Sequence, residues 1–113
     1  MSVDQAVTLH HPAREELELP AVLHALSDPQ RLQIVRELAG ASEPQPCGTI
    51  QLDVAKSTMT HHFRVLRESG VIRQERAGTT KLTSLRQADL DARFPGLLDA
   101  VLGSAKVPAP VGA

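Results

Sequence analysis

The clearest pattern of apolar and polar positions lies between residues 55 and 69. At about 100° per residue, Met59, Phe63 and Leu66 fall on one face of a helix, with His62 at its edge. The opposite face carries polar side chains: Ser57, His61, Arg64 and Glu68. Gly70 follows, and glycine tolerates the left-handed conformation that closes a helix. The pattern predicts an amphipathic helix with an apolar side for a core and a polar side for a partner.

A β-hairpin is predicted directly after this helix. Residues 71–76 have the composition of a strand, residues 77–79 form a short turn, and residues 80–86 alternate again around Leu82 and Leu85. The hairpin carries basic residues near its turn. A helix followed by a basic hairpin is a compact DNA-binding unit, in which the helix enters a major groove and the hairpin lies along phosphates.

The N-terminal half is predicted to contain two longer helices. Residues 13–26 have a helical stripe of Leu19, Val22, Leu23 and Leu26, which Pro20 either interrupts or starts afresh. Asp28 suits an N-cap and Pro29 the first helical position, so a second helix is expected from there to about Ala39.

The remaining segments complete the expected architecture. Residues 41–46 have the composition of a loop, and residues 47–53 have room for one or two helical turns. Residues 87–93 and 97–102 are expected to form helices, separated by Phe94-Pro95-Gly96. This order predicts a mostly α fold with a small β-hairpin, the winged helix-turn-helix. The expected domain covers residues 13–103, between a flexible arm at 1–12 and a disordered tail at 104–113.

Composition limits the class of protein. The 113 residues are 42% hydrophobic but only 2% aromatic, so one small domain with an aliphatic core is expected. No run of about 18 apolar residues predicts a membrane span, and no secretion signal is recognisable. One cysteine, Cys47, excludes an intramolecular disulfide framework. These features favour a soluble cytoplasmic protein without membrane partners.

Charge is segregated along the chain although the total is close to neutral. The net charge is −1, yet residues 55–86 carry seven Lys and Arg against two Asp and Glu. Residues 1–54 carry three basic side chains against eight acidic ones. Positive charge concentrated on the helix–hairpin unit is typical of a phosphate-binding surface. A solvated helix face beside an ordinary hairpin would explain the same charges.

Two stretches resemble a known family. Asp28-Pro29-Gln30-Arg31-Leu32 is similar to the Asp-Pro-x-Arg-Leu start of its second helix. Residues 57–72, STMTHHFRVLRESGVI, resemble its S-T-x-S-H-H-L-x-V-L-x-x-A-G-L-V signature. The family is the ArsR-type winged-helix transcriptional repressors, and the likeness covers roughly residues 20–102. It implies a homodimeric repressor that binds an operator on double-stranded DNA and releases it when an effector arrives.

The family's metal sites are not carried over. Where metal sensors of this family have Cys-x-Cys, the chain has Cys47-Gly48-Thr49, and no histidine follows His62. The Asp-x-His pattern of other members is replaced by Asp89-Leu90-Asp91. A soft-metal site needs several thiolate or imidazole ligands within reach of each other. Ala55 also replaces the usual Ser or Thr cap of the recognition helix, which leaves a weaker cap or moves the cap to Ser57.

The candidate DNA contacts combine hydroxyl, imidazole and cationic side chains, which can reach phosphates or base edges. They are Lys56, Ser57, Thr58, Thr60, His61, Arg64, Arg67, Arg73, Arg76, Thr79 and Lys81, with Thr80 beside them. Lys56 and the hairpin cations are expected on phosphates. His62 faces the packed side and is expected to be a structural histidine with its hydrogen bonds satisfied.

A homodimer is expected from apolar stripes at both ends of the domain, which one small subunit cannot easily bury. The candidate interface residues are Leu19, Val22, Leu23, Leu97, Leu98, Val101 and Leu102. Burial of both stripes inside one subunit is the alternative. Two-fold symmetry would place two recognition helices in successive major grooves about 34 Å apart, on an inverted-repeat operator.

Three other functions are alternatives to a DNA-binding regulator with an unidentified small-molecule effector. A metal or thiol sensor of the same fold would use Cys47 with His10, His11 and His24. A protein-binding module would leave the positive charge of residues 55–86 unexplained. An enzyme is not expected, because no phosphate loop, nucleophile elbow or paired carboxylates can be placed. No cofactor is expected either.

Overall fold

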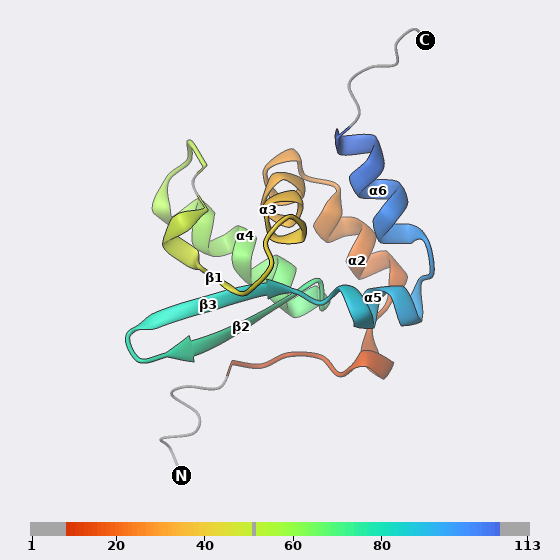
Figure 1. Cartoon of the computed structure of the whole chain (residues 1–113), viewed down its shortest axis with the longest axis horizontal. Coiled ribbons are helices and arrows are strands. Elements are labelled where there is room, and N and C mark those ends of the chain that lie inside the picture. The colour runs from red at the N-terminus through yellow and green to blue at the C-terminus, as the bar shows by residue number, and fades with distance from the viewer. Residues whose placement is uncertain (1–8, 51, 107–113) are drawn as a thin grey trace, which may run out of the picture.

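The computed structural model describes residues 9–50 and 52–106. The helices form one layer and a small sheet forms a second layer (Figure 1). Two of the strands make a hairpin, the wing, which extends away from the helices. The helices in chain order are η1 (Arg14–Glu16), α2 (Leu19–Leu26), α3 (Pro29–Ala39), η2 (Cys47–Thr49), α4 (Lys56–Ser69), α5 (Gln87–Arg93) and α6 (Leu97–Lys106). The strands are β1 (Gln45–Pro46), β2 (Ile72–Ala77) and β3 (Thr80–Leu85).

The single helix predicted over residues 13–26 is wrong in its first half. A short 3-10 turn, η1, ends at Glu16, and Leu17 is extended, with a φ of −68° and a ψ of 131°. Pro20 lies in the first turn of α2, where its missing N–H leaves no hydrogen bond unmade. The break lets Leu17 enter the core, where only 1% of its surface is exposed.

The start of α3 follows the prediction from Asp28 and Pro29. The Asp28 Oδ1 accepts hydrogen bonds from the backbone N–H groups of Gln30 and Arg31, at 2.8 and 3.2 Å. These bonds satisfy donors that have no partner inside the helix. The cap fixes where α3 begins, and it thereby fixes the side chains of Gln30 and Arg31 relative to α4.

The recognition helix α4 also has its predicted bounds. Phe63 and Leu66 are buried and Met59 is half-buried on the apolar face. Ala55 occupies the N-cap without a side-chain hydrogen bond, so the cap stays at this weaker residue. Gly70 ends the helix with a φ of 90°, the left-handed conformation expected there.

The sheet has one strand more than the predicted hairpin. The order is β1-β3-β2, and β1 pairs with β3 antiparallel through Gln45 opposite Thr83 and Pro46 opposite Leu82. The loop predicted for residues 41–46 therefore ends in an edge strand, where a proline is tolerated because one of its sides needs no partner. Within the wing, β2 and β3 pair from Ile72 opposite Leu85 to Ala77 opposite Thr80.

Both ends of the domain differ from the expected boundaries. Residues 9–12 were expected in a flexible arm, but they run beside β2 (Figure 1), and His11 and Pro12 are half-buried. At the other end α6 continues to Lys106, beyond the predicted boundary at 103. The rest of the expected arm and tail, residues 1–8 and 107–113, lies outside the described residues.

The core is aliphatic apart from Phe63, as the composition predicts. Its buried members are Leu17, Val22, Ala25, Leu26, Ile34, Val35, Leu38, Ile50, Phe63, Leu66, Val71, Ile72, Leu90 and Leu98. Within the described ranges, no helix has both the length and the apolar character that a membrane crossing requires.

Candidate nucleic-acid interface

The polar face of α4 is available to a partner. Lys56, Ser57, Thr60, His61 and Arg64 are exposed. Thr58 and Arg67, at the flanks of this face, are half-buried. The arrangement follows from the helical period, because the apolar face packs on the core and directs the other face outward. A helix with exposed hydroxyls, an imidazole and a guanidinium has the donors that phosphates and base edges accept.

The wing places two cations opposite each other. Arg76 and Lys81 are paired in the β2–β3 register, so their side chains share one face of the sheet. Like charges directly opposite each other destabilise a hairpin. Gln74, two residues before Arg76 on the same face, contacts α4. The cationic pair therefore continues the face of the sheet that is turned toward the recognition helix.

Arg73 lies on the other face of β2, where its Nη1 is 4.0 Å from a carboxylate oxygen of Glu75. Both side chains are substantially exposed, so this contact leaves the guanidinium free to move to a phosphate. Thr79 and Thr80 are exposed at the turn. The candidates on the wing are thus spread over both of its faces.

A groove of about 670 Å³ separates the recognition helix from the wing. Met59 and Phe63 supply its apolar part, and four cations surround them. The other lining residues come from α4, the wing, η2 and the N-terminal segment: Lys56, Thr60, Arg64, Arg67, Gln74, Lys81, Gly48 and Leu9. The groove thus brings candidates from α4 and β3 together on one surface, although Arg67 and Lys81, the nearest of them in sequence, belong to different elements of the chain.

Gln74 couples α4, the wing and the N-terminal segment. Its Oε1 accepts a hydrogen bond from the Arg67 Nη1 at 2.9 Å. Its backbone N–H donates to the His11 Nε2 at 3.0 Å. Only 1% of Gln74 is exposed, so these bonds form away from water. Burial, together with the nearby Arg73, lowers the pKa of His11 and favours the neutral ring that can accept this bond.

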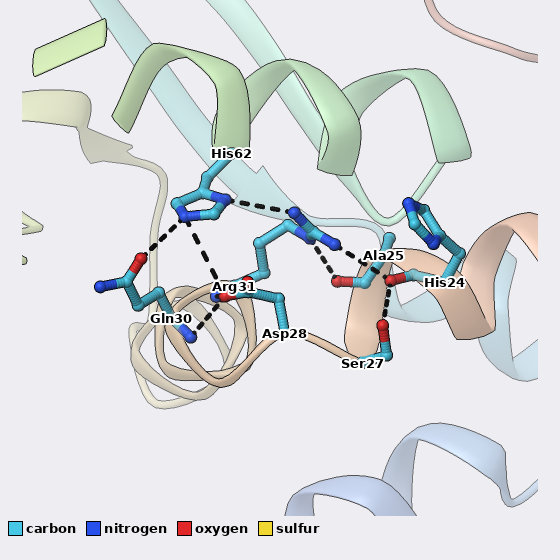
Figure 2. A network of polar contacts seen from close by, with 7 residues as sticks. All are labelled: His24, Ala25, Ser27, Asp28, Gln30, Arg31 and His62. Atoms are coloured by element: carbon cyan, nitrogen blue, oxygen red, sulfur yellow. Dashed lines mark hydrogen bonds and ion pairs between the residues drawn. The ribbon is translucent and has the colours of Figure 1, made fainter. Parts of the chain in front are cut away.

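A second polar network joins α4 to α2 and α3 (Figure 2). Arg31 is only 6% exposed, and its Nε and Nη2 donate to the backbone carbonyls of Ala25 and His24 at 2.8 and 3.2 Å. Its Nη1 lies 3.2 Å from the His62 Nδ1. One guanidinium therefore bridges the end of α2 and the recognition helix from a position in α3.

His62 is the structural histidine that the sequence predicts. Its Nε2 lies 2.9 Å from the Gln30 Oε1, and Figure 2 shows the ring between Gln30 and Arg31. A guanidinium has only donors, so the Nδ1 must accept and carry no proton. The Nε2 then carries the hydrogen and donates it to Gln30. The network therefore requires one neutral tautomer of His62.

The electrostatics agree with a neutral ring. Burial is the main cause that lowers the pKa of His62, and the neighbouring Arg31 and His61 lower it further. The Asp28 carboxylate, 4.0 Å from the His62 Nε2, opposes this shift. In turn, the backbone bonds from Arg31 and Gln30 lower the pKa of Asp28 against its desolvation, so this cap stays ionised.

Hydrogen bonds and an ion pair also hold the N-terminal segment against α5. The Arg86 Nη1 donates to the Pro12 carbonyl at 2.8 Å, and the Arg86 Nε donates to Asp89 at 2.9 Å. Arg14 contacts the other oxygen of Asp89 at 2.7 Å. The hydrogen bond from Arg14 is the largest cause that lowers the pKa of Asp89. This cluster holds residues 12–14 beside the start of α5.

The candidate dimer residues differ in exposure and fall into three groups. Val22 and Leu98 have 0% and 1% of their surface exposed within the single chain, which leaves a partner nothing to cover. Leu19 and Leu23, on α2, are 42% and 44% exposed. On α6, Leu97, Val101 and Leu102 are half-buried. The expected interface therefore narrows to the exposed leucines of α2 and the half-buried residues of α6.

The described histidines that were considered for a sensor site, His10, His11 and His24, are not gathered into one. Over residues 9–50 and 52–106, no cluster of three or more His, Cys, Asp or Glu side chains could hold a metal ion. His11 is engaged with Gln74, and His24 is exposed on α2. The side chain of Cys47 lies outside the described part of the structure.

Two residues of the two networks, Gln74 and Gln30, were not singled out from the sequence, and the contact of a third, His11, was not predicted. Gln74 alternates with the buried Ile72, so strand periodicity could have shown that it points inward. Gln30 lies two residues after the Asp28 cap, but no sequence pattern connects it to His62, 32 positions away. His11 lies in the segment that the sequence predicts as a flexible arm, and only the tertiary fold places it against β2.

Comparison with known proteins extends these observations. A family profile described as a helix-turn-helix domain matches residues 26–75. The HTH-type transcriptional regulator YceK of Bacillus subtilis (strain 168), itself described as uncharacterized, is 34% identical over 80 residues. The match covers 69% of this chain and 80% of that protein.

Solved structures share the fold. The transcriptional repressor BigR from Xylella fastidiosa is 26% identical, with a TM-score of 0.52, over 66% of this chain and 84% of that chain. An ArsR-like transcriptional regulator from Rhodococcus sp. RHA1 is 23% identical, with a TM-score of 0.54, over 77% of this chain and 88% of that chain.

Proposed function

Because the chain belongs to the helix-turn-helix transcriptional regulators and has the winged fold of ArsR-type proteins, we propose that it is a homodimeric repressor that binds an inverted-repeat operator. The observation that supports this most is the groove between α4 and the wing. There, exposed polar residues of the recognition helix and the wing cation Lys81 border one surface.

The recognition helix and the wing would contact different parts of the DNA. Thr60, His61 and Arg64 project from the middle of α4 and would contact base edges in a major groove. Lys56 precedes them at the helix start, and Arg76 and Lys81 lie side by side on the wing, where they would contact phosphates. The electrostatic cost of holding Arg76 opposite Lys81 is offset when a phosphate lies between them.

Dimer formation would give the operator its symmetry. Leu19 and Leu23 are large apolar side chains exposed on α2, and exposed apolar patches mark interaction sites. A second copy is the occupant that fits a small domain whose own core is already filled. Two recognition helices related by a two-fold axis would meet half-sites about one helical turn, or 34 Å, apart.

Release from DNA is assigned to an unidentified effector. The metal-site patterns of the family are not matched at Cys47-Gly48-Thr49 and Asp89-Leu90-Asp91, which favours a small-molecule effector over a soft metal ion. Stoichiometric zinc, cadmium or arsenite is therefore expected to leave a protein–DNA complex intact, which a gel-shift titration with each ion would measure. Dissociation by one equivalent of metal would reject this assignment.

Selection from a random duplex library tests the proposed function directly. The full chain is expected to enrich a duplex with two inverted half-sites, and affinity for this selected duplex should exceed that for a scrambled duplex by about 10³-fold or more. Enrichment of no sequence, or equal affinity for the two duplexes, would contradict sequence-specific binding. Enrichment of a single half-site bound by a monomer would contradict the dimer alone.

A further inference from the structure

The Arg31–His62 contact is a buried polar contact between the recognition helix and α3. His62 is on α4, and it follows His61, one of the candidates on the exposed face. Arg31 is on α3 and also holds the end of α2 through two carbonyls. Each of the three helices is thus tied to the others through one guanidinium, as Figure 2 shows.

We propose that Arg31 and His62 are positioning residues for DNA recognition, and that DNA binding requires the neutral form of His62. The proposal rests on the proposed DNA-binding function and names a control of that same site. Neither residue faces the groove or the exposed side of α4, so each acts through the placement of the helix and does not contact DNA.

Protonation would break the network at a definable atom. A proton on the Nδ1 of His62 removes the lone pair that Arg31 uses and turns an N–H toward the guanidinium at 3.2 Å. Two cations would then face each other in a site where His62 is 5% and Arg31 6% exposed. Rotation of the ring would not help, because the Nε2 side also carries a hydrogen.

The charged and titratable groups around His62 come from α3 and from α4 itself. From α3 and its cap they are Arg31 and Asp28, and from α4 the neighbouring ring of His61, with 6.0 Å between the ring centroids. The end of α2 contributes the carbonyls of His24 and Ala25, which Arg31 already occupies. Asp28 is the one group here that would attract a proton to His62, and it already accepts two backbone hydrogen bonds.

A conservative variant separates titration from packing. In His62→Gln, the amide oxygen can accept from Arg31 and the amide nitrogen can donate to Gln30, but the side chain cannot take up a proton. His24→Gln is the matched control, because it removes an exposed histidine side chain and leaves the His24 carbonyl in place. Arg31→Lys keeps the charge but cannot bridge three acceptors in one plane.

The experiment measures affinity for the selected duplex and for its scrambled form between pH 5.5 and 8, with far-UV circular dichroism at each pH. For the wild type and His24→Gln, specific affinity should fall by up to about tenfold per pH unit below the pKa of His62. His62→Gln should bind like the wild type at pH 8 and lose this dependence. Arg31→Lys should lose about tenfold or more at pH 8 while it remains helical.

The same pH dependence in His62→Gln and in the wild type would overturn the proposal. Full specific affinity in a folded Arg31→Lys variant would do so as well. If His62→Gln does not fold, proton and nitrogen NMR of the His62 ring in the free wild-type chain replaces it. The ring should then show an unprotonated Nδ1 at pH 7.5 and lose the Arg31 contact as it titrates; a protonated Nδ1 at pH 7.5 rejects the proposal.

Failure of DNA binding is distinguishable from failure of this inference. A wild-type chain that enriches no duplex at any pH contradicts the proposed function, whatever the state of His62. If the chain binds its selected duplex and substitution of His62 or Arg31 changes neither the affinity nor its pH dependence, the DNA-binding function stands. Only the positioning role is then rejected.

Discussion

The Nη1 of Arg67 donates a hydrogen bond to the Oε1 of Gln74 across 2.9 Å, which joins the recognition helix to the first strand of the wing. Arg67 was expected to contact DNA, and it is half-buried at the edge of the groove. Its position gives it a second role, which is to set the angle between α4 and the wing. The two roles differ in how affinity responds to salt.

Substitution of either partner tests which role dominates. Arg67→Ala and Gln74→Ala should each weaken specific binding, with the same dependence of log affinity on log salt concentration as the wild type. Arg76→Ala is the matched control, since loss of a phosphate contact should lower the salt slope by about one. A slope lowered by about one in Arg67→Ala, with wild-type affinity in Gln74→Ala, would identify Arg67 as a phosphate contact.

Gly70 is expected to be intolerant of any side chain. Its φ is 90°, and an added Cβ would collide with the Leu17 Cδ2. Gly70→Ala should therefore cost about 2–5 kcal/mol of unfolding free energy, from the left-handed backbone and the collision together. Urea denaturation measures this cost.

Gly78 supplies the control for this substitution. It also has a positive φ, 67°, but an added Cβ there would meet nothing within 4 Å. Gly78→Ala should cost only the backbone term of about 1–2 kcal/mol. Equal costs at the two positions would show that the packing of Leu17 against Gly70 contributes nothing to stability.

Stability should decrease on mild acidification. The pKa values of His11 and His62 are lowered from their ordinary value of 6.5 in the folded chain, so the unfolded chain binds protons more readily. Their contribution is complete above that value and is lost as the pH falls from it toward the folded pKa values. The double variant His11→Ala, His62→Gln should have a flatter profile of unfolding free energy between pH 7.5 and 5. An unchanged slope would contradict the buried, neutral state of both rings.

Substitutions on α2 test whether its exposed leucines form the dimer interface. Leu19→Glu and Leu23→Glu add charge to exposed apolar positions, whereas Ala21→Glu adds it to an exposed position on the opposite side of the same helix. Sedimentation at micromolar concentration should show monomers for the first two variants and a dimer for the wild type and Ala21→Glu. A dimer unaffected by both leucine substitutions would place the interface elsewhere.

The regular elements near the site were predictable from local pattern, and the contacts between them were not. The Asp28 cap, the Gly70 stop and the apolar face of α4 are each decided within a few residues, so periodicity and caps placed them correctly. The prediction of one continuous helix over residues 13–26 was wrong before α2, because the break there is favoured by burial of Leu17 in the core. The strand β1 was missed because two residues paired with β3 leave no alternation in the sequence.

The same distinction applies to the candidate site. The exposed face of α4 follows from helical geometry, and so does the inward position of His62. The partners of that histidine are Gln30 and Arg31, more than 30 positions earlier, and only the packing of α3 against α4 brings them into contact. Leu98 was expected on a surface stripe, but it is buried because the rest of the chain covers that side of α6.

Sequence-specific binding by the exposed face of α4 is tested most directly by the affinity of Arg64→Ala and His61→Ala for the selected and scrambled duplexes. Arg14→Ala is the arginine control outside α4 and the wing. Each α4 variant should lose about 1–3 kcal/mol of discrimination between the two duplexes and remain folded, while Arg14→Ala discriminates like the wild type. Wild-type discrimination in both α4 variants would remove this helix from the interface.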